Sequence, residues 1–198
     1  MGVSSHASVA RSRATFIGSI LVMLLVGFGQ VSQQPAQAGE RGPFSLVDHR
    51  GRSVTDLTFR GKFMLVFFGY THCPDICPTD LQIMGAALDH LGGRSRRVQP
   101  IFVTIDPQRD TAEVLAAYVP NFHPRMVGLT GTPAQIASAA AVYRVRYRKF
   151  FPASESAPYL LDHSASIYLV GPKGRPLSHY PHGMTSKAIA ADIRRFLK

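Results

Sequence analysis

The sequence predicts an α/β fold, a three-layer α/β/α sandwich whose central mixed sheet is preceded by an N-terminal hairpin. The first indication is a continuously apolar run, 63–68, as expected for a strand buried on both faces. The second is a similar segment at 98–105, separated from the first by a helical pattern. The third is the end of the chain, where a hairpin pattern precedes a closing amphipathic helix.

The first elements follow from turn and helix-start signals. Segments 44–48 and 54–55 flank a His-Arg-Gly turn at 49–51 and predict the entry hairpin. The strand at 63–68 ends at a glycine and leads into a loop. Proline suits the first turn of a helix, so we predict a helix that starts at Pro78 and continues to about residue 91.

The remaining elements continue the alternation of strands and helices. We expect, in order, a strand over 98–105, a helix over 111–118, a strand over 126–129, a helix over 132–143, an extended segment over 145–150, a hairpin formed by 166–170 and 176–180, and a helix over 186–197. This order is typical of a sandwich of the thioredoxin type, in which sites lie at the carboxyl ends of the central strands.

Composition bounds the class of protein. The chain has 198 residues with 22 Lys and Arg against 12 Asp and Glu, a formal net charge of +10. Its 45% apolar content is ordinary for a globular domain. A basic protein can bind nucleic acid, but no recognition motif accompanies the charge, so we expect no nucleic-acid partner.

The N-terminus predicts export. Arg11 and Arg13 precede an apolar run over 14–28, which is close to the shortest length that spans a bilayer. The arginines favour the cytoplasmic side, which places the rest of the chain outside. Residues 36–38 read Ala-Gln-Ala, a cleavage pattern, so a removable signal peptide is the alternative to a retained anchor.

We therefore predict three parts: a signal or anchor segment over 1–29, a polar linker over 30–41, and a single domain over 42–198. The protein is expected to be periplasmic, or anchored in the inner membrane with its domain on the periplasmic side.

The chemistry concentrates in two cysteines, the only ones in the chain, at Cys73 and Cys77. A lone pair cannot build a disulfide framework, so it forms either a redox couple or part of a metal site. Three residues intervene where dithiol oxidoreductases usually have two. Two thiolates on one short loop suit a soft cation such as Cu(I), or Zn(II). The best candidate for a third ligand is His163.

The helix start next to the cysteines is expected to favour thiolate over thiol and lower the cysteine pKa. One helical turn between the two thiols would put their Cα atoms about 6 Å apart, within disulfide range. Cys73 and Cys77 are therefore also candidates for a redox-active disulfide that would exclude metal.

Other polar residues near these motifs have plainer interpretations. His72 is a weak alternative ligand, because neighbouring side chains rarely converge on one ion. Asp162 is a candidate for orienting the His163 ring. Asp106 fits a turn or a site equally well, and His179 and His182 are expected on the surface.

Three segments together resemble the Sco/SenC family: the loop Phe67–Leu81, the segment Phe102–Thr111, and Asp162–Ala165. The resemblance covers about residue 42 to the end. It implies a thioredoxin-like fold and copper, as Cu(I), Cu(II) or both, bound by Cys73, Cys77 and His163. It also implies a tethered or exported protein that matures the binuclear copper centre of cytochrome c oxidase.

Two functions follow. One is a copper metallochaperone, whose partners would be the copper-bearing subunit of the oxidase and a copper donor protein. The other is an enzyme, a thiol–disulfide reductase that keeps the copper-ligand cysteines of the target reduced. Four basic residues, which we call the basic strip, are candidates for docking an acidic partner or anionic lipid: Arg144, Arg146, Arg148 and Lys149.

Overall fold

The computed structural model describes residues 44–152 and 158–198, all within one compact unit. The expected signal or anchor segment and the linker lie outside the described residues, so both remain predictions. Across the two described stretches, no helix has the length and apolar character needed to cross a membrane.

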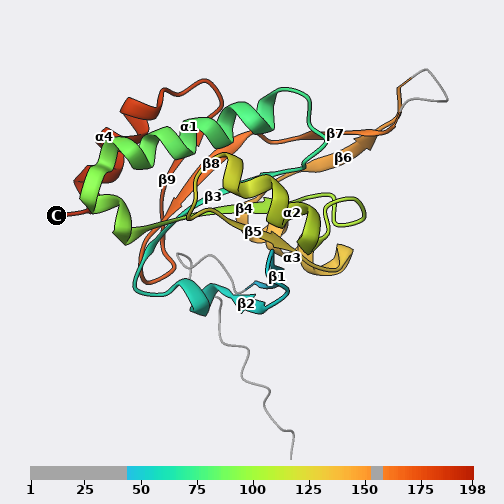
Figure 1. The fold of residues 1–198 in the computed structure, drawn as a ribbon, viewed down its shortest axis with the longest axis horizontal. Coiled ribbons are helices and arrows are strands. Elements are labelled where there is room, and N and C mark those ends of the chain that lie inside the picture. Colours follow the sequence, from blue (N-terminus) through green and yellow to red (C-terminus); the bar gives the residue numbers. More distant parts are fainter. Residues whose placement is uncertain (1–43, 153–157) are drawn as a thin grey trace, which may run out of the picture. The chain divides into compact units, whose positions relative to one another are not determined.

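The described residues form a seven-stranded mixed sheet in the order β2-β1-β5-β4-β3-β8-β9 (Figure 1). Its strands are β1 (Ser45–Asp48), β2 (Ser53–Thr55), β3 (Phe63–Gly69), β4 (Val98–Thr104), β5 (Val127–Thr130), β8 (Ser166–Val170) and β9 (Pro176–Pro181). The β3–β4 and β4–β5 pairs are parallel, and the remaining pairs are antiparallel. The expected entry hairpin is the β1–β2 pair.

Helices cover both faces of this sheet: α1 (Ile76–Leu91), α2 (Ala112–Tyr118), α3 (Pro133–Tyr143) and α4 (Ser186–Phe196), with short 3-10 turns η1 (Asp56–Phe59), η2 (Gly92–Arg97) and η3 (Val119–Asn121). The steps from β3 to β4 and from β4 to β5 run in the same direction across the sheet. Right-handed crossovers therefore place α1 and α2 on one face. The helix α4 packs beside α1 (Figure 1).

Aromatic contacts confirm this layering. On the α2 face, the Tyr118 ring lies 5.7 Å from that of Phe102, which in turn lies 6.5 Å from Phe67. On the opposite face, the Tyr143 ring of α3 lies 5.1 Å from Phe68. Phe67 and Phe68 point to opposite faces because successive strand residues alternate. The predicted three-layer thioredoxin-like α/β/α sandwich is thus confirmed.

All seven residues of β3 are buried, as the continuous apolar run predicted. The strand ends at Gly69, and the following loop brings the cysteines to the carboxyl end of the sheet. The fold therefore places the candidate site where open α/β sheets hold theirs.

One local prediction was wrong, and one strand was missed. The helix α1 begins at Ile76 rather than at Pro78, so Cys77 lies inside its first turn. A proline is tolerated there because the first four N–H groups of a helix have no partner within it. The structure also contains a strand that was not predicted: β7 (Leu160–His163) pairs with β6 (Tyr147–Phe150) in a separate two-stranded sheet.

Close packing between α1 and the segment after α2 depends on Gly85. A Cβ there would overlap the backbone carbonyl oxygen of Phe122, which cannot move without shifting the chain. We expect Gly85→Ala to lower the free energy of unfolding by about 1–3 kcal/mol, although alanine is the better helix former. Urea unfolding measures this. The matched control is Gly93→Ala, whose Cβ would meet nothing within 4 Å. Equal stability of both variants would contradict the packing argument.

Candidate metal centre

The cysteine loop folds back over the start of α1. The backbone N–H of Cys73 donates to the carbonyl of Tyr70 at 3.2 Å, and the N–H of Cys77 points at the sulfur of Cys73 at 3.5 Å. Cys77 is fully buried, whereas Cys73 is partly exposed. A Cβ on Gly69 would come within 2.7 Å of the Cys77 sulfur, so only glycine leaves room for that sulfur at the end of β3.

The third candidate ligand, His163, is the last residue of β7. Its Nε2 lies 3.4 Å from the Cys77 sulfur. Its Nδ1 lies 3.2 Å from the carbonyl oxygen of Ser164. Because a carbonyl can only accept a hydrogen bond, Nδ1 is protonated in this contact, and Nε2 is the ring nitrogen that faces the sulfurs.

Aromatic rings fix the orientation of this imidazole. The rings of Phe67 and Tyr70 lie 6.2 and 6.0 Å from that of His163, both in edge-to-face arrangements. The Tyr70 hydroxyl also accepts the backbone N–H of Leu161 at 3.1 Å, which attaches β7 to the cysteine loop. The imidazole is therefore held in place before any metal arrives.

The structure brings all three predicted site residues together. The Cys73 and Cys77 sulfurs and a ring nitrogen of His163 lie within 4.8 Å of one another. Within the described residues, no other cluster of three or more His, Cys, Asp or Glu side chains offers ligand atoms this close. A small adjustment would give three bonds to one cation.

The pKa values of the two thiols are shifted in opposite directions. A hydrogen bond from the Cys77 thiol, assisted by His163 and by backbone N–H groups, lowers the pKa of Cys73 to about 3. Donating that bond, together with burial, raises the pKa of Cys77. The expectation of a lowered pKa therefore holds for Cys73 and is wrong for Cys77 in the metal-free protein. At neutral pH the pair is one thiolate and one thiol.

The neighbouring polar residues have their own partners. Asp162 does not orient the His163 ring; its carboxylate pairs with Arg148 at 3.1 Å on the surface. His182 is exposed, as predicted, and its Nδ1 also lies 3.0 Å from the buried carboxylate of Asp80. His72 is exposed, and its nearest partner is the Thr71 hydroxyl at 3.1 Å.

Asp106 has a structural role. It accepts hydrogen bonds from Arg109 and, at 2.7 Å, from the hydroxyl of Tyr159. Arg109 in turn donates to the Tyr159 carbonyl at 3.0 Å, with its guanidinium 3.7 Å above that ring. These contacts fasten the segment entering β7 to the loop after β4, and so hold His163 near the cysteines.

The sequence interpretation missed Asp110, which is completely buried. Its carboxylate accepts the backbone N–H of Thr71 at 3.0 Å and the hydroxyls of Thr71 and Thr104 at 2.6 Å each. Asp110 therefore anchors the start of the cysteine loop. The only available signal was a carboxylate four residues after Asp106, just past the carboxyl end of a central strand.

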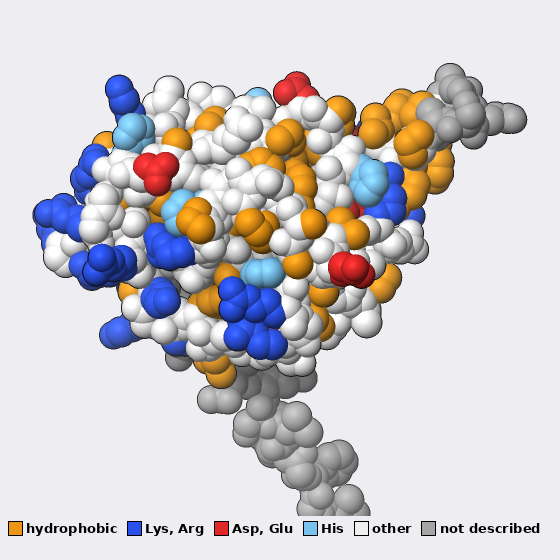
Figure 2. Space-filling model, in the orientation of Figure 1, with side chains coloured by type: hydrophobic (Ala, Val, Ile, Leu, Met, Phe, Trp, Pro, Cys, Tyr) orange, Lys and Arg blue, Asp and Glu red, His pale blue; other side chains and the backbone are white. Residues whose placement is uncertain are grey.

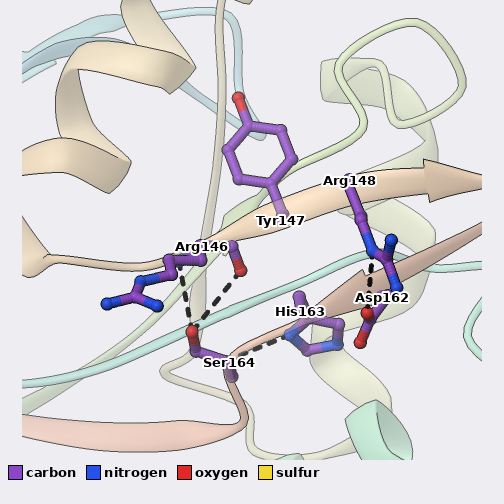
Figure 3. Close-up of a pocket in the computed structure, with 6 residues that line it drawn as sticks. All are labelled: Arg146, Tyr147, Arg148, Asp162, His163 and Ser164. Atoms are coloured by element: carbon purple, nitrogen blue, oxygen red, sulfur yellow. Dashed lines mark hydrogen bonds and ion pairs between the residues drawn. The ribbon is translucent and has the colours of Figure 1, made fainter.

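Two hollows border the β6–β7 sheet and share Asp162 and His163. One, of about 360 Å³, has Arg146, Tyr147, Arg148 and Ser164 as its other lining residues. Figure 3 shows Arg148 reaching Asp162 and Ser164 bonding back to the Arg146 backbone beside the His163 ring. The other, of about 300 Å³, is lined by Cys73 and includes Phe150 in its wall.

Comparison with known proteins gives a consistent result. A family model described as SCO1/SenC matches residues 32–198. The human "Protein SCO2 homolog, mitochondrial" is 42% identical over 159 residues, covering 79% of this chain and 59% of that protein. The human "Protein SCO1 homolog, mitochondrial" is 36% identical over 189 residues, covering 88% and 62%. This chain thus spans about three fifths of the length of these curated relatives.

Solved structures agree with the fold. Bradyrhizobium japonicum ScoI with copper bound superposes with a TM-score of 0.72 at 41% identity, covering 80% of this chain and 99% of that one. Yeast Sco1 with copper bound gives a TM-score of 0.73 at 35% identity, covering 80% and 88%.

Proposed function

This chain belongs to the SCO1/SenC family, and from that premise we propose that it is a copper metallochaperone that serves the binuclear copper centre of cytochrome c oxidase. The observation that carries the proposal is the convergence of two sulfurs and one imidazole nitrogen within 4.8 Å. Relatives with copper bound share the same fold at 35–41% identity. Copper is here a cargo that the protein receives and passes on.

The donor set supports this cargo. Thiolates are the soft ligands that select Cu(I), and an added imidazole also accommodates Cu(II). A structural zinc site would normally close with a fourth protein ligand, and the cluster holds three. Cys73 is ready as a thiolate, whereas Cys77 must lose its proton when the metal binds.

The geometry also supports transfer. Cys77 is buried and Cys73 is partly exposed, so an incoming ligand reaches the metal from the Cys73 side. Ligands of a partner can then replace those of this chain one at a time. We propose the copper-bearing oxidase subunit as the acceptor and a separate copper protein as the donor. The N-terminal segment would export the domain and, if it is retained, anchor it.

Anaerobic titration of the reduced protein with Cu(I), in competition with a chromogenic chelator, tests the proposal. We expect one tightly held ion per chain. The variants Cys73→Ser, Cys77→Ser and His163→Ala should each weaken binding by at least about tenfold, or ~1.4 kcal/mol. The matched control is His179→Ala, an exposed histidine outside the cluster. Tight binding that survives all three substitutions would refute the site.

A thiol–disulfide reductase is the second candidate, and a specific observation favours it. Cys73 is partly exposed and its pKa is lowered to about 3, as in reactive cysteines, with a second thiol close by to resolve a mixed disulfide. The exchange needs only the two sulfurs. Replacing His163 with Ala should therefore spare reduction of a disulfide substrate while weakening copper binding. If the His163→Ala variant lost reductase activity but still bound copper tightly, His163 would belong to the reductase chemistry rather than to the copper site.

A further inference from the structure

We propose that one face of the β6–β7 sheet docks an acidic partner protein, which brings its own metal ligands to Cys73 through the adjoining hollow. We call this surface the outer hairpin face; it is formed by Arg146, Arg148 and Phe150. The inference rests on the proposed function, because it concerns how the acceptor or donor of the metal reaches the site.

Access to the metal cluster is directional. Cys77 is fully buried, so a partner's ligand must approach Cys73. The hollow of about 300 Å³ beside Cys73 is lined largely by apolar groups, among them Ile76, Leu160 and Phe150. Any partner that enters this hollow must therefore contact the β6–β7 sheet.

Strand geometry decides which side chains such a partner meets. Side chains alternate along a strand, so Arg146, Arg148 and Phe150 share one face of β6. Opposite them in register lie Asp162 and Leu160 of β7. Lys149 points the other way, where it bonds Gln108 at 2.8 Å and lies 4.2 Å above the Tyr159 ring. The basic strip is therefore divided, and its arginines form the outer part.

The outer hairpin face carries exposed apolar surface next to its arginines. Phe150 is 54% exposed on this face, whereas Phe151 is 70% exposed on the other side of the hairpin, with its ring 6.2 Å from that of Tyr159. They are two of the four exposed large hydrophobic residues in the described part of the chain. Figure 2 shows hydrophobic side chains gathered at the β6–β7 end of the molecule, with basic side chains next to them. Burying an exposed aromatic side chain against a partner stabilises a complex through the hydrophobic effect.

The charge of this surface specifies an acidic partner. Arg144, Arg146 and Arg148 are all exposed, and among the described residues the acidic side chains that line the hollow beside Cys73 are Asp75 and Asp162. The Arg148–Asp162 pair is exposed at both ends, with side-chain exposures of 79% and 63%. Such a pair contributes little, so a partner's carboxylates can replace it. Opposite charge on the partner would speed encounter and fix its register.

A protein fits this surface better than a membrane does. Phe150 lines the hollow that has Cys73 in its wall, and Arg146 and Arg148 line the neighbouring hollow, which shares Asp162 and His163 with it. Ligand exchange requires groups that enter the hollow beside Cys73. A lipid surface could cover the arginines but would bring no metal ligand to the sulfur.

The test is binding of the purified soluble copper-bearing domain of a cytochrome c oxidase subunit from the same genome to the copper-free, reduced full chain in detergent. Kd is measured at low and high salt. The double variant Arg146→Glu/Arg148→Glu should weaken binding at least tenfold at low salt and flatten its salt dependence. Phe150→Ser should weaken binding at both salt concentrations.

The matched control is Arg94→Glu/Arg96→Glu, which makes the same change in charge on the exposed turn η2. This turn follows the opposite end of α1 from the cysteines, about 24 Å of helix away (Figure 1). Binding should stay within about twofold of the wild type. Equal weakening by the control would overturn the inference. So would wild-type affinity in the Arg146→Glu/Arg148→Glu variant, which we call the outer-face variant, or the absence of binding by the wild type.

A second experiment measures binding of the same proteins to vesicles of phosphatidylglycerol and phosphatidylcholine. If the outer-face variant lost vesicle binding and kept its affinity for the copper domain, a lipid surface would be the partner and the inference would be wrong. Copper transfer is measured separately. Binding that depends on the outer hairpin face, without any transfer of copper, would support the docking surface and contradict the proposed function.

Discussion

Replacing Cys77 with Ala is expected to move the pH midpoint for ionisation of Cys73 upward by several units. The pKa of Cys73 is lowered to about 3, and the largest cause is the hydrogen bond that the Cys77 thiol donates to it. Alanine removes this donor, whereas Cys77→Ser keeps a hydroxyl in its place. The serine variant should therefore retain most of the lowering. His163→Ala should raise the midpoint by less than Cys77→Ala, because the hydrogen bond with His163 lowers the pKa of Cys73 less than the hydrogen bond from Cys77 does.

The measurement is thiolate absorbance near 240 nm, or the pH profile of alkylation, on the metal-free protein. The midpoint is more informative than the rate at one pH, because a thiolate of low pKa is also intrinsically less nucleophilic. If Ala and Ser at position 77 gave the same midpoint, the hydrogen bond would not be the cause. The helix N-terminus and its backbone N–H groups would then be the main source of the lowered pKa.

The same pKa values predict the pH dependence of stability. The folded pKa of Cys73, about 3, lies below its ordinary value of 9.0, so the folded state binds fewer protons between these limits. The resulting stabilisation is fully present above pH 9, declines as the pH falls, and is absent below pH 3. Cys77 acts in the opposite sense, because its raised pKa removes stability above pH 9. Urea unfolding of the reduced protein across this range measures both effects, with a Cys73→Ser/Cys77→Ser variant as reference.

The substitution Asp110→Ala is expected to lower the free energy of unfolding by about 3–5 kcal/mol, because it leaves three donors without an acceptor in a buried site. The backbone N–H of Thr71 is one of these donors, so the start of the cysteine loop loses its anchor. Copper affinity should fall together with stability.

The control is Asp110→Asn. Its amide oxygen can accept from the Thr71 N–H and the Thr104 hydroxyl, and its NH₂ group can donate to the Thr71 hydroxyl, which rotates to accept. We therefore expect a loss of about 1–2 kcal/mol, since neutral hydrogen bonds replace charged ones. Urea unfolding and copper titration of the same samples give both quantities. Equal losses for Asn and Ala would show that the charge of Asp110, rather than its hydrogen bonds, holds the loop.

Much of the candidate site was predictable because its signals are local. Cys73 and Cys77 lie four residues apart beside a helix start, and the apolar run before them is typical of a buried strand. Other features depend on pairings across the chain. Cys77 and His163 are 86 residues apart, and Thr71 and Asp110 are 39 apart. A single sequence contains no periodic pattern that reports such contacts.

Hydrophobic periodicity and turn residues were enough to predict the fold class and the order of nearly all helices and strands. The three residues of the cluster and the family were predicted from the segments that resemble Sco/SenC proteins. The existence of β7 and the start of α1 before Cys77 became visible in the folded chain. So did the opposite pKa shifts of Cys73 and Cys77 and the anchoring of the loop by Asp110. A thiol's pKa and a buried carboxylate's role depend on which donors surround them, and those donors come from distant segments that meet only when the chain folds.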